Sequence, residues 1–274
     1  MDKTVRIRVG NQTAHSARDM TEPFEYALNR GFDAFEWFPD KKESGAGWKV
    51  GEVSIDLRRL LRQRARSHDM EFYFHAPLDV NLLGPEGEEA LIQHVQFAQE
   101  IGASLFTIHP FVDGGTEVFL RALRPLMRRL DRFNMGLSIE NTPDTGPGIF
   151  NDLFRKLRST DWTEECRVGM CLDVGHANLC SATRNDYLAY VDSLDRLVPI
   201  IHLHLHENYG DSDTHLPIFT GPAGVDPFAV QALLERLKER HFSGAIILEQ
   251  WPEPPSLLDN ARERLLDMLS GSAS

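Results

Sequence analysis

Histidines, aspartates and glutamates recur in this chain directly after short apolar runs, from residue 75 to residue 249. Carboxylates and imidazoles beside buried strands cost free energy unless they are paired, so a repeated pattern of them needs a partner. Oxygen and nitrogen donors are the groups that bind divalent metal ions in proteins. The residues are His75, His109, Glu140, Asp173, His176, His204, Asp213, His215 and Glu249. Their pattern predicts a metal site assembled from strand ends.

The apolar runs have the composition of buried strands and alternate with amphipathic segments of helical length. The expected strands are 5–9, 33–38, 71–76, 105–109, 136–141, 168–173, 199–206 and 245–250, and the clearest helices are 56–69, 86–102, 117–135 and 227–241. These alternating units predict one closed (β/α)₈ TIM barrel over residues 1–270, with a disordered tail at 271–274. An open doubly wound sheet is the competing architecture, but no GxGxxG motif follows the first strand to favour it.

A barrel of this kind carries its active site at the carboxyl ends of its strands. Glu140, Asp173, His204 and Glu249 come from the fifth to the eighth expected strand, so they should be neighbours around the ring. Three carboxylates and one imidazole suit Mn²⁺, Mg²⁺ or Co²⁺, with Zn²⁺ as a further possibility. These four residues are the predicted metal ligands.

The seventh expected strand has histidines at every second position, so His202, His204 and His206 share one of its faces. Same-face neighbours on a strand are about 6.5 Å apart, which is too far for one metal ion to bind two of them easily. One histidine is therefore expected to be a ligand and another to support it or to serve a structural role. A structural role is favoured for His202, which lies deepest in the strand.

The bulk composition narrows the class of protein. The formal net charge of −12 argues against nonspecific binding to nucleic acid or to an anionic membrane surface. Three cysteines without a CxxC pair are typical of a reducing compartment. The first residues lack the pattern of a signal peptide, and no apolar run approaches the length of a membrane span. A cytoplasmic protein is expected.

Seven segments together resemble the xylose-isomerase-like TIM-barrel superfamily, which contains sugar isomerases, sugar epimerases and the endonuclease IV family. In chain order they are HAPLDVNL, the IHP strand end, IENTP, CLDVGHANL, HLHEN, DTHLPIFTGPAGVDP and LEQWP. They extend from residue 75 to residue 252. The resemblance implies the same barrel fold, and homo-oligomers are common in that superfamily.

Resemblance to the isomerase and epimerase branch implies one divalent ion held by Glu140, Asp173, His204 and Glu249. Glu140 and Glu249 would then transfer protons to and from a sugar, sugar acid or polyol, while His176 would hold a substrate oxygen. A dehydratase would share the first proton transfer and is a further alternative. The chain lacks an arginine in NYGDSD and a second glutamate in TPDTGPG, where the ketose 3-epimerases have them, so a ketohexose is not the expected substrate.

Resemblance to the endonuclease IV branch implies three zinc ions and cleavage of abasic DNA. Its ligands would be all nine residues of the opening pattern, with Glu140 between two ions. This chain has Leu78 where those enzymes have a tyrosine, and its loops lack an arginine and aromatic stripe for DNA. The favoured prediction is therefore an isomerase or epimerase with one ion and a small carbohydrate-like substrate. His75, His109, His176, Asp213 and His215 would then contact substrate or bind further ions.

Aromatic residues beside the strand ends are candidates for the walls of a substrate site. Trp37, Phe111 and Trp251 each lie beside the end of an expected strand. Indole and phenyl rings in such places pack against sugar rings or carbon chains, and they equally pack against the rim of a barrel. The sequence predicts substrate contact for these three residues.

Overall fold

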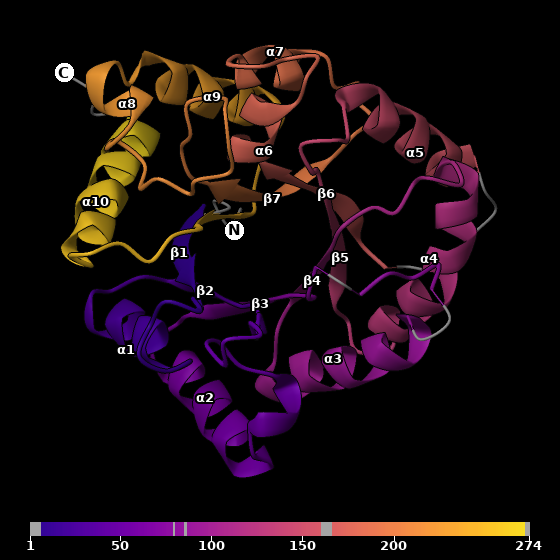
Figure 1. The fold of residues 1–274 in the computed structure, drawn as a ribbon, viewed down its shortest axis with the longest axis vertical. Helices are drawn as coiled ribbons and strands as arrows, with labels where there is room; N and C mark the ends of the chain where they lie inside the picture. The colour runs from indigo at the N-terminus through magenta and orange to yellow at the C-terminus, as the bar shows by residue number, and fades with distance from the viewer. Residues whose placement is uncertain (1–6, 79, 85–86, 160–165, 272–274) are drawn as a thin grey trace, which may run out of the picture.

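The structure is a computed structural model that describes residues 7–78, 80–84, 87–159 and 166–271. Eight strands pair in chain order and close into a barrel, and each strand is parallel to both neighbours. Figure 1 shows the strands as a central ring with the helices around it. This confirms the predicted (β/α)₈ TIM barrel. The tail predicted at 271–274 lies outside the described residues from residue 272 onward.

The elements alternate along the chain as the sequence pattern predicts. The strands are β1 (Arg8–Gln12), β2 (Ala34–Trp37), β3 (Glu71–His75), β4 (Leu105–Ile108), β5 (Gly136–Glu140), β6 (Val168–Asp173), β7 (Ile200–Leu205) and β8 (Ala245–Leu248). The helices are α1 (Glu22–Asn29), α2 (Ile55–Ser67), α3 (Gly87–Ile101), α4 (Thr116–Asp131), α5 (Pro147–Ser159), α6 (Val174–Leu179), α7 (Tyr187–Asp192), α8 (Pro222–Val225), α9 (Phe228–Glu239) and α10 (Ser256–Ser270), with a short 3-10 helix, η1, at Val50–Glu52. No described helix is both long and apolar enough to cross a membrane.

The first strand differs from its predicted position. The sequence pattern places it at 5–9, but β1 continues through Gly10 to Gln12. A glycine usually interrupts a strand, yet here it allows close approach, because a Cβ at Gly10 would lie 2.3 Å from the Ala34 carbonyl oxygen of β2. The longer strand brings Gln12 to the barrel mouth, opposite Glu36.

Side-chain alternation separates an outer core from the barrel interior. The aromatic side chains of Phe35, Trp37 and Phe72 face outward and pack on Phe24 of α1, with ring centroids 4.8 to 6.4 Å apart. Inside the barrel, a small apolar cluster comprises Ala34, Tyr73, Leu105, Ala245 and Ile247. Polar side chains fill the barrel interior between this apolar cluster and the mouth. The side chains at the mouth therefore pack on a filled interior.

Candidate metal centre

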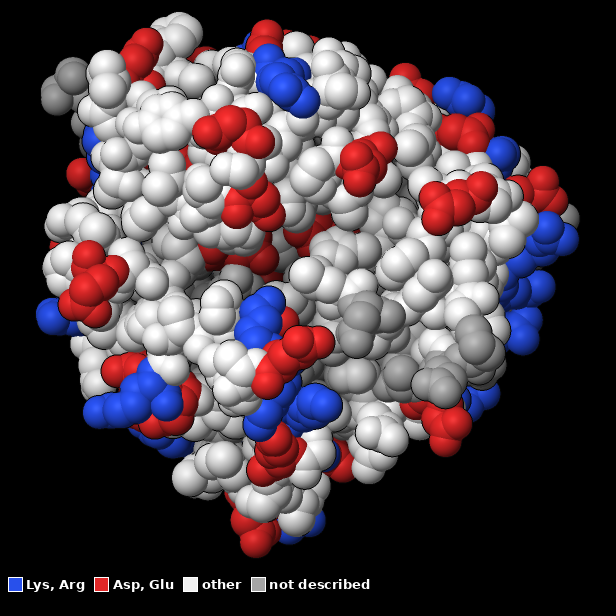
Figure 2. Space-filling model, viewed as in Figure 1, with Lys and Arg blue, Asp and Glu red and all other residues white. Residues whose placement is uncertain are grey.

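The mouth of the barrel contains a cavity of about 690 Å³. Figure 2 shows this central hollow with acidic side chains at its floor. Seven of the nine predicted donors line it: His75, His109, Glu140, His176, Asp213, His215 and Glu249. The other two, Asp173 and His204, are fully buried beside it. The parallel closed barrel therefore brings all nine residues together.

The four predicted metal ligands form one compact group, here called the Asp173 group (Glu140, Asp173, His204 and Glu249). One donor atom from each lies within 4.8 Å of the others. The His204 Nδ1 atom is 3.2 Å from Glu140 Oε1, 3.5 Å from Glu249 Oε2 and 3.9 Å from Asp173 Oδ2. Three carboxylates converging on one imidazole nitrogen fit a divalent cation.

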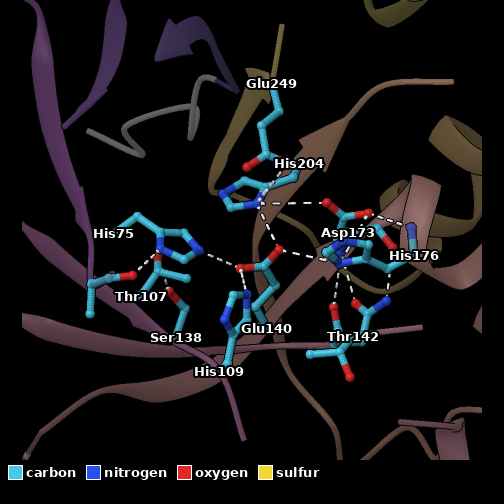
Figure 3. Close-up of polar contacts among 12 residues, drawn as sticks. His75, Thr107, His109, Ser138, Glu140, Thr142, Asp173, His176, His204 and Glu249 are labelled. Atoms are coloured by element: carbon cyan, nitrogen blue, oxygen red, sulfur yellow. Dashed lines mark hydrogen bonds and ion pairs between the residues drawn. The ribbon is translucent and has the colours of Figure 1, made fainter. Parts of the chain in front are cut away.

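Glu140 also belongs to a second group, the His75 group (His75, His109 and Glu140). Its Oε2 atom is 2.5 Å from His75 Nε2 and 3.0 Å from His109 Nε2. Its other oxygen faces His204 and the Asp173 group. Figure 3 shows the Glu140 carboxylate between the two sets of side chains. One carboxylate thus offers one oxygen to each group.

A third set of donors, the Asp213 group (His176, Asp213 and His215), lies nearer the solvent. The Nε2 atoms of His176 and His215 are 3.2 and 3.1 Å from the same Asp213 oxygen, Oδ2. Asp213 comes from the loop after β7, and its pKa is held well below the usual range by these two histidines, although burial opposes that shift. The three side chains can therefore hold a cation that is separate from the deeper groups.

Three histidines of the site, His75, His176 and His215, share a bonding pattern that is typical of metal ligands. Their Nδ1 atoms lie close to backbone carbonyl oxygens: His75 to Ala76 at 2.6 Å, His176 to Asn141 at 2.8 Å, and His215 to Glu249 at 2.8 Å. An Nδ1–H that donates to a carbonyl leaves the Nε2 lone pair directed at a carboxylate. The Nε2 lone pair and the carboxylate oxygen are both acceptors, so a proton or a metal ion must lie between them.

The pKa shifts of the histidines also indicate that a proton or a metal ion lies between each imidazole and its carboxylate. Burial acts to lower the pKa of His176 and His215, but neighbouring carboxylates, chiefly Asp173 and Asp213 respectively, outweigh it. The pKa of His215 rises to about 10 and that of His176 rises well above its usual value. These imidazoles therefore hold protons where a metal ion would otherwise neutralise the carboxylates.

A family model described as a xylose isomerase-like TIM barrel matches residues 24–268 of the chain. The chain belongs to this family. Among curated proteins it is similar to a probable endonuclease 4 from Thermoplasma volcanium, with 23% identity over 176 residues. That alignment covers 61% of each protein, so the chain spans about three fifths of this relative's length.

Solved structures share the fold over nearly the whole chain. A D-tagatose 3-epimerase-like protein superimposes with a TM-score of 0.73 and 20% identity, covering 98% of this chain and 100% of that one. Endonuclease IV from Thermus thermophilus superimposes with a TM-score of 0.62 and 22% identity, covering 96% and 99%. The names of these two neighbours denote different chemistries on one barrel.

The sequence did not identify Glu36, a glutamate that contacts a histidine of the Asp173 group. It is fully buried inside the barrel, and its carboxylate is 2.7 Å from His204 Nε2 and 3.2 Å from His202 Nε2. Burial alone would raise the pKa of Glu36, but the two histidines hold it well below its usual value. The contact with His204 leaves Nδ1 of that ring for the Asp173 group. A glutamate within the aromatic strand DAFEWF was the available signal.

His206 lies between the Asp173 and Asp213 groups. Its Nε2 atom is 3.2 Å from Asp173 Oδ2, and its ring stacks on His215 with centroids 3.9 Å apart and planes 4° apart. Gly175 makes room for it, because a Cβ there would lie 1.9 Å from His206 Cε1. The three histidines in β7 and directly after it therefore have different surroundings, since His202 lies beside Glu36.

The aromatic residues predicted to contact substrate have three different positions. Trp251 lines the cavity and packs edge-on against Tyr26, with centroids 5.6 Å apart. Phe111 is half-buried against the apolar core and is not among the described residues that line the cavity. The prediction for Trp37 was wrong in position: it is fully buried in the outer core, because Glu36 points inward and the next residue on a strand must point outward.

Proposed function

We propose that this protein is a metal-dependent phosphoester hydrolase that holds three divalent ions at the barrel mouth. The observation that carries the proposal is the Glu140 carboxylate, which offers one oxygen to the His75 group and the other to the Asp173 group. Both oxygens of a carboxylate engaged in this way suit a bridge between two ions. The Asp213 group supplies a third set of ligands beside them.

The cluster suits attack on a phosphate ester. Bound divalent ions lower the pKa of water and neutralise charge on phosphate oxygens. Glu249 presents a carboxylate at the cavity wall; its buried Oε2 atom makes no hydrogen bond to any described residue and lies 3.5 Å from His204 Nδ1 in the Asp173 group. Burial raises the pKa of Glu249, which favours a role in accepting and returning a proton.

The cavity favours a small phosphate ester over DNA. Lys42 is the one lysine or arginine among the described residues that line it. Binding to a nucleic acid backbone depends on several phosphate contacts from lysines and arginines. A volume of about 690 Å³ falls in the range of pockets for small molecules. The preferred substrate is therefore a phosphorylated metabolite, and nucleic acid is not an expected partner.

Metal content and hydrolysis together test this proposal. We expect close to three ions per chain by elemental analysis after loading with Zn²⁺ or Mn²⁺, and hydrolysis of 4-nitrophenyl phosphate or its bis ester. Glu140→Gln should lower the content to about one ion and abolish hydrolysis, because two groups lose their shared ligand. Glu253→Gln changes an exposed glutamate and serves as the control. A wild-type protein with one ion and no hydrolysis would contradict the proposal.

The raised pKa of Glu249 also favours a second candidate, an isomerase or epimerase of sugars, sugar acids or polyols. A buried carboxyl with a raised pKa can exchange a proton with carbon beside a metal-bound carbonyl or hydroxyl. Glu140 would have to supply the second proton-transfer group, and His176 a substrate contact. Incorporation of solvent deuterium into the sugar, lost in Glu249→Gln, with one ion per chain, would support this candidate over the hydrolase.

A further inference from the structure

A second cavity lies outside the barrel, against the outer face of β7. Its described lining residues come from α6, β7, α8, α9 and the loops between them, in the upper part of Figure 1. It shares none of these residues with the cavity at the mouth. Its volume is about 220 Å³, so at about 30 Å³ per water molecule it holds roughly seven waters or one small organic molecule.

Two carboxylates give the lining of this second cavity a negative charge. Glu207 is only 8% exposed, and its oxygens accept hydrogen bonds from the backbone N–H groups of Gly221 and Ala223 at 3.0 and 2.5 Å. Asp226 adds an exposed carboxylate, and no lysine or arginine is among the described lining residues. Two amide dipoles do not neutralise a buried charge, so the cavity favours a cation.

His206, which also lines this cavity, adds an acceptor that has no partner in the described part of the chain. Its Nε2 atom is 3.2 Å from Asp173 Oδ2, and a carboxylate only accepts, so Nε2 carries the proton. The neutral ring then has a lone pair on Nδ1, and the whole residue is only 1% exposed. Buried acceptors nearly always have a donor, so this atom indicates a ligand that brings a hydrogen.

Tyrosine rings form the aromatic part of the wall. Tyr187 is half-buried and Tyr209 is exposed, and both line the cavity. Burial, followed by the charge of Glu207, raises the pKa of Tyr187 above its usual value, which places its hydroxyl in a negative potential. The faces of tyrosine rings attract cations, and guanidinium groups also stack on them.

These features together restrict the charge and the hydrogen-bonding groups of a ligand. The two carboxylates would repel an anion. A neutral alcohol would bring a hydrogen but would leave the buried charge of Glu207 without a counter-charge. A guanidinium or primary ammonium group carries a positive charge and N–H donors but no acceptor, so it complements the carboxylates, the His206 nitrogen and the tyrosine rings.

We propose that this second cavity, between α6 and α8, binds a small organic cation that carries a guanidinium or primary ammonium group on a short apolar chain. The buried side chains of Val174, Leu205 and Ile218 supply an apolar wall for that chain. The site is distinct from the metal centre, which it contacts through the His206 ring. Its occupant is therefore separate from the molecule that reacts at the mouth.

The test measures binding to the Zn²⁺-loaded protein by calorimetry. The probes are propylguanidinium, propylammonium, propanol and tetramethylammonium. Propanol has the same carbon chain without the charge, and tetramethylammonium has the charge without an N–H donor. Each titration is repeated with inorganic phosphate present, which addresses the mouth and not this cavity.

Three variants accompany the wild type. Glu207→Gln removes the buried charge. Ala229→Leu fills the cavity from α9 without changing a hydrogen bond of Glu207, and alanine and leucine are both strong helix formers. Glu239→Gln removes an exposed carboxylate at the end of the same helix and is the control.

We expect one propylguanidinium or propylammonium per chain, with or without phosphate, and binding of propanol and tetramethylammonium that is at least about tenfold weaker. Glu207→Gln should weaken both bound cations about 10- to 100-fold, because a hydrogen bond to a charged group is lost. Ala229→Leu should abolish their binding, and Glu239→Gln should leave it unchanged. If loss of the α8 contacts prevents Glu207→Gln from folding, as its melting temperature will show, Ala229→Leu decides the question.

Several results would overturn the cation site. One is the absence of binding of either cation to the wild type. Another is binding that persists in a folded Ala229→Leu protein, which would place the cation elsewhere. Equal binding of propanol or tetramethylammonium would show that the charge or the N–H donors are not recognised. Failure of the protein to bind phosphate would count against the hydrolase and leave the cation site standing.

Discussion

Replacing Glu36 by glutamine should weaken metal binding at the Asp173 group without removing a ligand. Within the Asp173 group, the hydrogen bond of Glu36 is to His204, at 2.7 Å from its Nε2 atom, in a fully buried interior. A hydrogen bond to a charged group contributes about 1.5–3 kcal/mol, and loss of such supporting partners commonly lowers metal affinity about 10- to 100-fold. We therefore expect a loss of affinity of about 10- to 100-fold at this one group.

Chelator competition with Zn²⁺ or Co²⁺ measures each binding step. The hydrogen bonds of the Asp213 group do not involve Glu36, so this group provides an internal reference and its affinity should stay the same. Tyr73→Phe removes a different buried polar atom from the same barrel interior and is the matched control. Unchanged affinity at every step in Glu36→Gln, or an equal loss at all of them, would refute the idea that Glu36 orients His204.

The raised pKa values of His176 and His215 leave both imidazoles protonated at neutral pH in the metal-free protein. Binding of Zn²⁺ should therefore release protons, and the affinity for Zn²⁺ should rise between about pH 6 and pH 9. Calorimetry in buffers of different ionisation enthalpy measures the protons, and heats independent of buffer would contradict the prediction. In the metal-free fold, the stabilisation from these histidine–carboxylate pairs should be complete below about pH 6.5 and be lost as the pH rises toward the raised pKa, which is about 10 for His215. Urea unfolding at a series of pH values measures this stabilisation. A free energy of unfolding that rises over that range would count against the pairs. Gly175→Ala should destabilise the fold by about 1–3 kcal/mol in chemical denaturation, because its Cβ would collide with His206, whereas Gly148→Ala, with open space around it, should not. Trp37→Ala should lower stability by about 3–5 kcal/mol while the folded protein keeps its full metal content, since Trp37 lies in the outer core; a variant that folds normally but loses metal would show that this placement is wrong.

Strand and helix periodicity was enough to predict the barrel because buried parallel strands must be apolar and their helices must be amphipathic. The strand at 168–173 was predicted with the bounds of β6, and most others differ by one or two residues at an end. The first strand was misplaced because Gly10 resembles an end signal locally. Only its pairing with β2 shows that a small residue is needed there for close approach.

The sequence also determined which donors gather at the mouth, because side chains at the carboxyl ends of parallel strands in a closed barrel must meet. It did not determine how they divide into groups. That Glu140 directs its two oxygens to different sets, and that Glu36 holds the far side of His204, depends on side-chain directions set by long-range packing.

The same limit applies to the walls of the cavity. Glutamines are ordinary surface residues in a sequence, so nothing marked Gln12 or Gln250 until the closed barrel placed both of them, buried, in the wall of the cavity. Trp37 shows the converse, since an aromatic residue near a strand end was predicted to bind substrate and instead faces the helices. The sequence determined the kinds of chemical groups available, and tertiary structure decided which of them face the cavity. The direction of a side chain depends on the register of its strand and on the closure of the barrel.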